Sequence, residues 1–126
     1  MAVSRKQEER ALSKDEWELV QRSHHPTVQE LSDSDLRDLL KTVRERRDRA
    51  RGEVNRKRRE MRGKAAPKGG QPAAKDEGTR KKLGVLAMSM RRLNGEHERR
   101  RQLAARIDLV ENARHALALS KEKKAA

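Results

Sequence analysis

The chain has 126 residues, of which 42% are charged, and its net charge is +13. With 33% hydrophobic residues, one Trp and no Phe or Tyr, it cannot build an aromatic-rich globular core, and the absence of Cys excludes disulfides and thiolate metal sites. No alternating run of Val, Ile and Thr predicts a strand. We therefore expect an all-α fold in which Leu, Val, Ala and Met carry the burial.

The N-terminal segment, residues 1–34, is acidic, with seven acidic and five basic residues. Its first part, residues 1–12, is polar and is expected to be frayed. Ser13 and Glu16 then have the spacing of a capping box, which predicts a short helix over 14–22. The segment either folds back on the basic remainder of the chain as a packing lid or docks on another protein, and we favour the lid.

Residues 35–62 are expected to form a long basic helix, capped by Ser32 or Ser34. Thirteen of the residues between 33 and 64 are Lys or Arg. Apolar residues recur at spacings of 4 and 3 along one stripe, which two cations interrupt in its later part. The stripe consists of Leu36, Leu40, Val43, Arg47, Ala50, Val54, Lys57 and Met61. Packing should therefore be strong early in the helix and weak late, and Gly63 is placed to end it.

A linker is expected over residues 63–79, where four of the seven glycines and two of the three prolines fall. This composition is typical of a flexible tether that lets the flanking helices fold against each other or separate. The segment lacks the GxxxxGK[ST] pattern of a P-loop, so its glycines indicate flexibility and not a phosphate cradle.

A second long basic helix is expected over 80–120, capped by Thr79 and followed by a basic tail over 121–126. Its apolar residues again recur at helical spacing: Leu83, Leu86, Met90, Leu93, Leu103, Ile107, Val110 and Leu117. Asn94-Gly95 allows either a turn between two helices or one helix that tolerates a glycine, and we favour one helix. The expected architecture is an elongated helical hairpin, or a coiled-coil-like arrangement, of two long basic helices plus a short N-terminal helix.

The density of arginine predicts a polyanionic partner. We expect the chain to contact the phosphate backbone of duplex DNA or structured RNA, alone or within a ribonucleoprotein, because guanidinium groups pair with phosphates and counterion release supplies affinity without a sequence code. The candidate contacts are Arg44, Arg46, Arg47, Arg49, Arg51, Arg56, Lys57, Arg58, Arg59, Arg62, Arg91, Arg92, Arg99, Arg100 and Arg101. The residue pattern does not choose between DNA and RNA, and it specifies no base sequence.

Two alternatives account for the same residues. The cations can form a solvated face held by i,i+4 pairs such as Glu53 with Lys57. The Leu stripes can also make the protein a structural adaptor, which oligomerises or binds another protein, and this architecture is compatible with nucleic-acid binding.

Other functional classes have little support in the sequence. No spacing of Ser, His and Asp predicts a nucleophile or an acid–base pair, so we expect no enzyme and no cofactor. The adjacent His24 and His25 lack the convergent ligands that a metal needs. No run of about 18 apolar residues predicts a membrane span, and the narrow Leu faces do not favour a membrane-surface helix. Without a signal-peptide pattern, we expect a cytoplasmic protein.

Overall fold

In the computed structural model, residues 3–63 and 77–126 are described, and every regular element among them is helical. The helices are α1 (Arg5–Ala11), α2 (Lys14–Gln21), α3 (Thr27–Glu30), α4 (Asp33–Met61) and α5 (Glu77–Ala125). The chain divides into two compact units, residues 1–94 and 95–126, with the division inside α5. The predicted all-α class, with two long helices packed together, is confirmed. Most of the expected linker, residues 64–76, lies outside the described residues.

Three short helices precede α4, where the sequence predicted one. Residues 5–11 were expected to be frayed, but Ser4 and Gln7 form a capping box that starts α1: the Ser4 hydroxyl accepts from the Gln7 N–H, and the Gln7 side chain accepts from the Ser4 N–H. Ser13 caps α2 as expected, with its hydroxyl accepting from the Glu16 N–H. The expectation of a frayed beginning was therefore wrong for these residues.

The long helix α4 begins where a hydroxyl cap predicts it. The Ser32 side chain accepts from the Asp35 N–H at 3.1 Å, and Asp33 and Asp35 lie in the first turn, at the positive end of the helix dipole. Gly63 has a φ of 71°, a left-handed conformation that glycine adopts without steric cost, and its N–H bonds to the carbonyl of Glu60. Both ends of α4 therefore follow from local residue chemistry: a hydroxyl cap at the start and a left-handed glycine just after the end.

The buried face of α4 follows the predicted stripe over most of its length. Its buried apolar residues are Leu36, Leu39, Leu40, Val43, Ala50 and Val54. Arg47 and Lys57 are half-buried, as expected of cations that interrupt a seam, whereas Met61 is 52% exposed. The stripe thus ends at Lys57 and not at Met61, one turn before the helix does.

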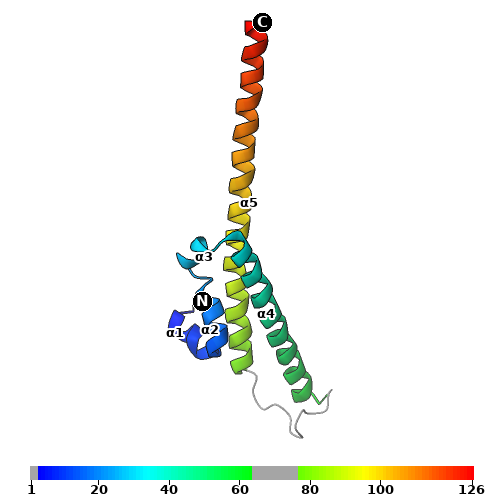
Figure 1. Cartoon of the computed structure of the whole chain (residues 1–126). Helices are drawn as coiled ribbons and strands as arrows, with labels where there is room; N and C mark the ends of the chain where they lie inside the picture. Colours follow the sequence, from blue (N-terminus) through cyan, green and yellow to red (C-terminus); the bar gives the residue numbers. More distant parts are fainter. Residues whose placement is uncertain (1–2, 64–76) are drawn as a thin grey trace. The chain divides into compact units, whose positions relative to one another are not determined.

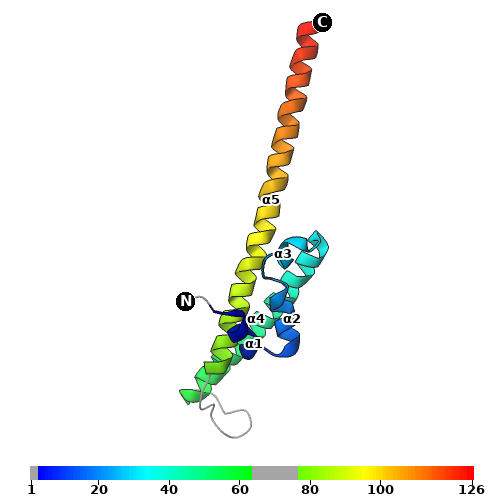
Figure 2. The same ribbon diagram turned by 90° about the vertical axis from the view of Figure 1, so that its left-hand side faces the viewer.

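Within the first unit, α4 and the beginning of α5 run side by side and antiparallel (Figures 1 and 2). Val85, Leu86, Met90 and Leu93 supply the buried apolar residues of α5. At one end of the pair the Lys57 Nζ donates to the Thr79 Oγ1 at 2.7 Å. Thr79 does not cap the helix as expected, because α5 already includes Glu77.

The acidic N-terminal segment packs onto this helix pair. Leu12, Val20 and Val28 belong to the same buried cluster as Leu36 of α4 and Leu86 of α5, and Trp17 lies against that cluster, partly buried. The segment thus folds back on the helix pair as a packing lid, the first of the two interpretations.

The second unit, residues 95–126, is the continuation of α5. The helix passes through Asn94-Gly95 without a turn and continues to Ala125, so the residues expected as a basic tail are mostly helical. All side chains from Arg101 onward are exposed.

Candidate nucleic-acid interface

A stripe of cations runs along the exposed side of α4. Its members are spaced by 4, 3, 7, 7 and 4 residues, a pattern that keeps them on one side of an α-helix. We call it the α4 cation stripe: Arg37, Lys41, Arg44, Arg51, Arg58 and Arg62, all of which are exposed. From Arg37 to Arg62 the helix rises about 38 Å, which is close to one helical turn of B-DNA.

These cations have no ion-pair partner within the described parts of the chain. Asp48 lies on the same side of α4, but its carboxylate accepts from Arg47, the cation that sits in the seam. Neighbouring like charges such as Arg58 and Arg62, four residues apart, repel each other by a few tenths of a kcal/mol. Among the described residues, the stripe therefore forms no ion pair that would stabilise the fold, and a bound polyanion would relieve the repulsion between its members.

Other predicted cations of α4 bond to side chains of the protein itself. Arg56 Nη1 bonds to Glu60 Oε1 at 2.8 Å, and the Glu60 side chain is buried. Lys57 bonds to Thr79, as described above, and not to Glu53 as the solvated-face alternative proposed. The interpretation that i,i+4 pairs hold the basic face thus applies to part of α4 but not to the cation stripe.

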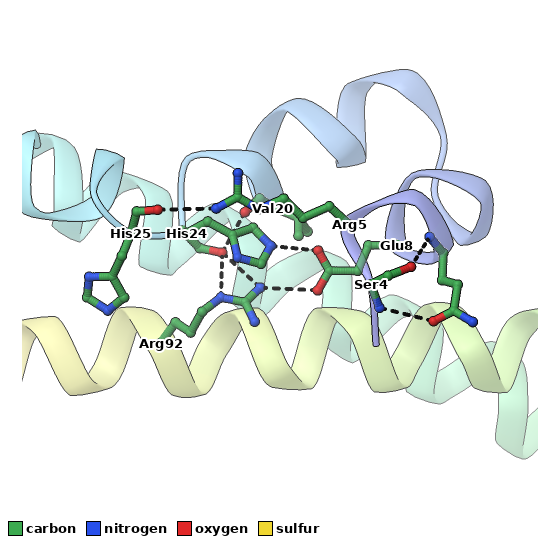
Figure 3. Close-up of polar contacts among 9 residues, drawn as sticks. Ser4, Arg5, Glu8, Val20, His24, His25 and Arg92 are labelled. Carbon is green, nitrogen blue, oxygen red and sulfur yellow. Dashed lines mark hydrogen bonds and ion pairs between the residues drawn. The ribbon is translucent and has the colours of Figure 1, made fainter. Parts of the chain in front are cut away.

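Arg92 lies in a buried polar cluster between the N-terminal segment and α5 (Figure 3). Its guanidinium donates two hydrogen bonds to the Ser23 hydroxyl, at 3.2 and 3.1 Å, and lies 3.7 Å from a carboxylate oxygen of Glu8. The other oxygen of Glu8 is 2.6 Å from His24 Nε2. Burial lowers the pKa of Arg92, an effect that the Glu8 carboxylate opposes. Arg92 therefore fixes the lid to α5 and does not belong to an exposed interface.

This cluster also accounts for the role of His24, one of the two adjacent histidines, because His24 is a partner of the buried Glu8. The backbone carbonyl of His25 accepts a hydrogen bond from the Arg5 guanidinium at 3.2 Å (Figure 3). Over residues 3–63 and 77–126, no group of three or more His, Asp or Glu side chains is arranged to hold a metal ion.

The three consecutive arginines of the second unit are all paired with glutamates. Arg99 donates through Nε and Nη2 to Glu96 at 2.9 and 2.8 Å, and Arg100 Nε donates to Glu96 at 2.8 Å. The hydrogen bond from Arg99 is the main cause that lowers the pKa of Glu96 from 4.5 to about 2. Arg101 is bound in the same way by Glu98 and lowers the pKa of that carboxyl. A phosphate would have to compete with these carboxylates.

The structure thus separates the predicted candidates by exposure. Nine are exposed: Arg44, Arg49, Arg51, Arg58, Arg59, Arg62, Arg91, Arg99 and Arg101. Six are partly buried: Arg46, Arg47, Arg56, Lys57, Arg92 and Arg100. Arg37 and Lys41 were missed among the candidates, although their spacing to Arg44 in the sequence could have placed them on the same side of the helix.

The chain matches no protein-family model, no curated protein and no solved structure. Among the described residues, no helix is long and apolar enough to cross a membrane. The interpretation of the site therefore depends on the residues themselves.

Proposed function

We propose that the protein is a non-enzymatic nucleic-acid-binding protein whose α4 cation stripe contacts the phosphate backbone of duplex DNA or structured RNA. One observation carries the proposal: the stripe is exposed and unpaired within the described residues, while Arg56, Arg92 and Arg99 are satisfied by acids of the protein itself. Guanidinium groups form charge-assisted, fork-like bonds with phosphate, and such contacts require no base-specific partner.

The recognised feature is the phosphate backbone, which DNA and RNA share. Stacking on unpaired bases has little support because the chain's one aromatic residue, Trp17, lies partly buried against the core. A helix that lies along a duplex can bring successive cations to successive phosphates, whereas a flexible single strand offers no such fixed spacing. We therefore expect duplexes and hairpins to bind better than unstructured strands.

The proposal is tested by charge removal with a matched control. The stripe variant replaces Arg44, Arg51, Arg58 and Arg62 with Gln, which keeps side-chain length and helix propensity. The control variant replaces four exposed cations of the N-terminal segment with Gln, so that both variants lose four positive charges: Lys6, Arg10, Lys14 and Arg22. Circular dichroism checks that both variants remain folded.

Affinity is measured by fluorescence anisotropy with a DNA duplex, an RNA hairpin and an unstructured strand, between about 50 and 200 mM salt. For the stripe variant we expect a large loss of affinity and a slope of log K against log salt that is shallower by up to about 0.9 per lost contact on B-DNA. The control variant should keep a slope close to that of the parent. Equal losses in both variants would mean that net charge and not the stripe is responsible.

The adaptor function is the second candidate, and the exposed apolar side chains of the second unit favour it. If the parent protein bound neither duplex DNA nor structured RNA, the adaptor function would replace the nucleic-acid proposal.

A further inference from the structure

The second unit exposes an apolar seam. Leu103, Ile107, Val110 and Leu117 are 48%, 49%, 48% and 57% exposed, and they follow one another at spacings of 4, 3 and 7 residues on one side of α5. Arg114 occupies the remaining position of the seam, between Val110 and Leu117. Apolar side chains at this spacing, here over about two heptads, are the a/d pattern of a coiled-coil interface.

Three of the five seam positions, Leu103, Ile107 and Leu117, have the residue types of a two-stranded parallel coiled coil. In heptad notation Ile107 and Arg114 occupy a positions, while Leu103, Val110 and Leu117 occupy d positions. A β-branched residue at a, combined with Leu at d, favours two parallel strands. A charged residue at an a position lowers the stability of such a dimer and at the same time fixes its register.

The order of residues along the seam also favours a parallel alignment. When two copies lie parallel and in register, each of the four apolar positions meets its own counterpart, and Arg114 meets Arg114. In an antiparallel dimer, a positions of one helix face d positions of the other. In every such alignment, at most two of the four apolar residues face an apolar residue of the seam on the other helix. The remaining positions then face residues such as Arg100 or Lys121. The apolar burial available to a dimer is therefore greatest in the parallel arrangement.

The charges beside the seam agree with the same alignment. Arg106 occupies a g position and Glu111 the following e position, five residues later. In a parallel coiled coil these positions on opposite helices are neighbours, so Arg106 of each copy faces Glu111 of the other. Two such pairs form by symmetry, and both residues are exposed in the single chain. This complementarity favours a second copy of the chain as the partner.

We propose that residues 103–121 of α5 associate with the same residues of a second copy as a parallel, in-register, two-stranded coiled coil. The proposal goes beyond nucleic-acid binding and does not depend on it, because no residue of the α4 cation stripe takes part. Failure of one proposal therefore leaves the other intact.

The first test is the oligomeric state of the full chain by analytical ultracentrifugation up to about millimolar concentration. We expect a concentration-dependent dimer. Arg114→Leu should tighten the dimer by about tenfold or more, because it replaces two facing guanidinium groups with an apolar layer. Ile107→Ala should weaken dimerisation, whereas Leu109→Ala, off the seam on the same helix, should not change it. A parent that stays monomeric throughout, or an Arg114→Leu variant that dimerises no better, would overturn the proposal.

The second test uses the absence of cysteine to measure strand orientation. Lys121→Cys places one thiol at the a position that follows the seam, and Lys123→Cys places one at the outward c position two residues later. In the parallel dimer the two thiols introduced at position 121 face each other and should form a disulfide under mild oxidation, whereas the Lys123→Cys variant should react slowly. In the antiparallel alignments that bring two apolar positions together, the two 121 positions are at least about 27 Å apart, far beyond the reach of a disulfide. Equal cross-linking of the two variants, or none in either, would overturn the parallel seam.

Discussion

The buried cluster of Glu8, His24, Ser23 and Arg92 makes a quantitative prediction about how the N-terminal segment is held. Arg92→Met removes the cation but leaves the Glu8 carboxylate, whose side chain is 3% exposed. Removing one partner of a fully buried ion pair costs about 3–5 kcal/mol. Here the expected cost is lower, about 2–3 kcal/mol, because Glu8 keeps His24 as a partner and the Arg92 side chain is 19% exposed.

The assay is a double-mutant cycle with Glu8→Met, followed by urea and thermal unfolding. A cost of about 2–3 kcal/mol corresponds to a fall in Tm of about 8–24 °C for a unit of fewer than 100 residues. The double variant removes both charges, so neither is left buried without the other. Its loss in the free energy of unfolding should therefore be smaller than the sum of the two single losses by about 1–3 kcal/mol. If the single effects instead add to within about 0.5 kcal/mol, Glu8 and Arg92 do not act as a pair and the account of the lid is wrong.

Two further predictions concern α5. Leu93→Ala, at a fully buried position, should cost about 3–5 kcal/mol in the free energy of unfolding. Leu109→Ala, at a side chain that is 69% exposed, should cost less than about 0.5 kcal/mol, and similar effects of the two would contradict the burial of Leu93 in the core cluster. Because the folded pKa of Glu96 lies below the unfolded value, its bonds to Arg99 stabilise the helix fully above about pH 4.5, and the stabilisation is lost as pH falls towards 2. Acid titration followed by circular dichroism should therefore show a loss of helicity between pH 4.5 and 2 that is smaller in Glu96→Gln. An identical titration in that variant would mean that Arg99 does not lower the pKa of Glu96.

The sequence predicted those features of the fold that depend on local chemistry and periodicity. Ser13 and Ser32 cap helices because their hydroxyls accept from the first turn, and the Leu residues of α4 face the core because they recur at helical spacing. The α1 helix was missed although Ser4 and Gln7 carry a capping-box signal, because the polar composition of the first residues was given more weight.

The candidate site was less predictable, because exposure and pairing depend on contacts between distant residues. Arg92 resembles its neighbour Arg91 in the sequence, yet Ser23 and Glu8, far away in the chain, take it into a buried cluster. For Arg99 and Arg101, acids three residues earlier were visible in the sequence, but which cations they bind is decided by side-chain geometry. Arg37 and Lys41 precede the dense run of arginines, so charge density does not indicate them, whereas their spacing to Arg44 does.

The central claim, that the α4 cation stripe contacts phosphate, is tested most directly by residue-resolved NMR of arginine side chains in this 14.5 kDa protein. On titration with a DNA duplex or an RNA hairpin, the Nε–Hε signals of Arg44, Arg51 and Arg58 should shift in a salt-dependent way, while the signal of the buried Arg92 stays in place. Shifts concentrated on Arg99 and Arg101, with the α4 signals unmoved, would contradict the account.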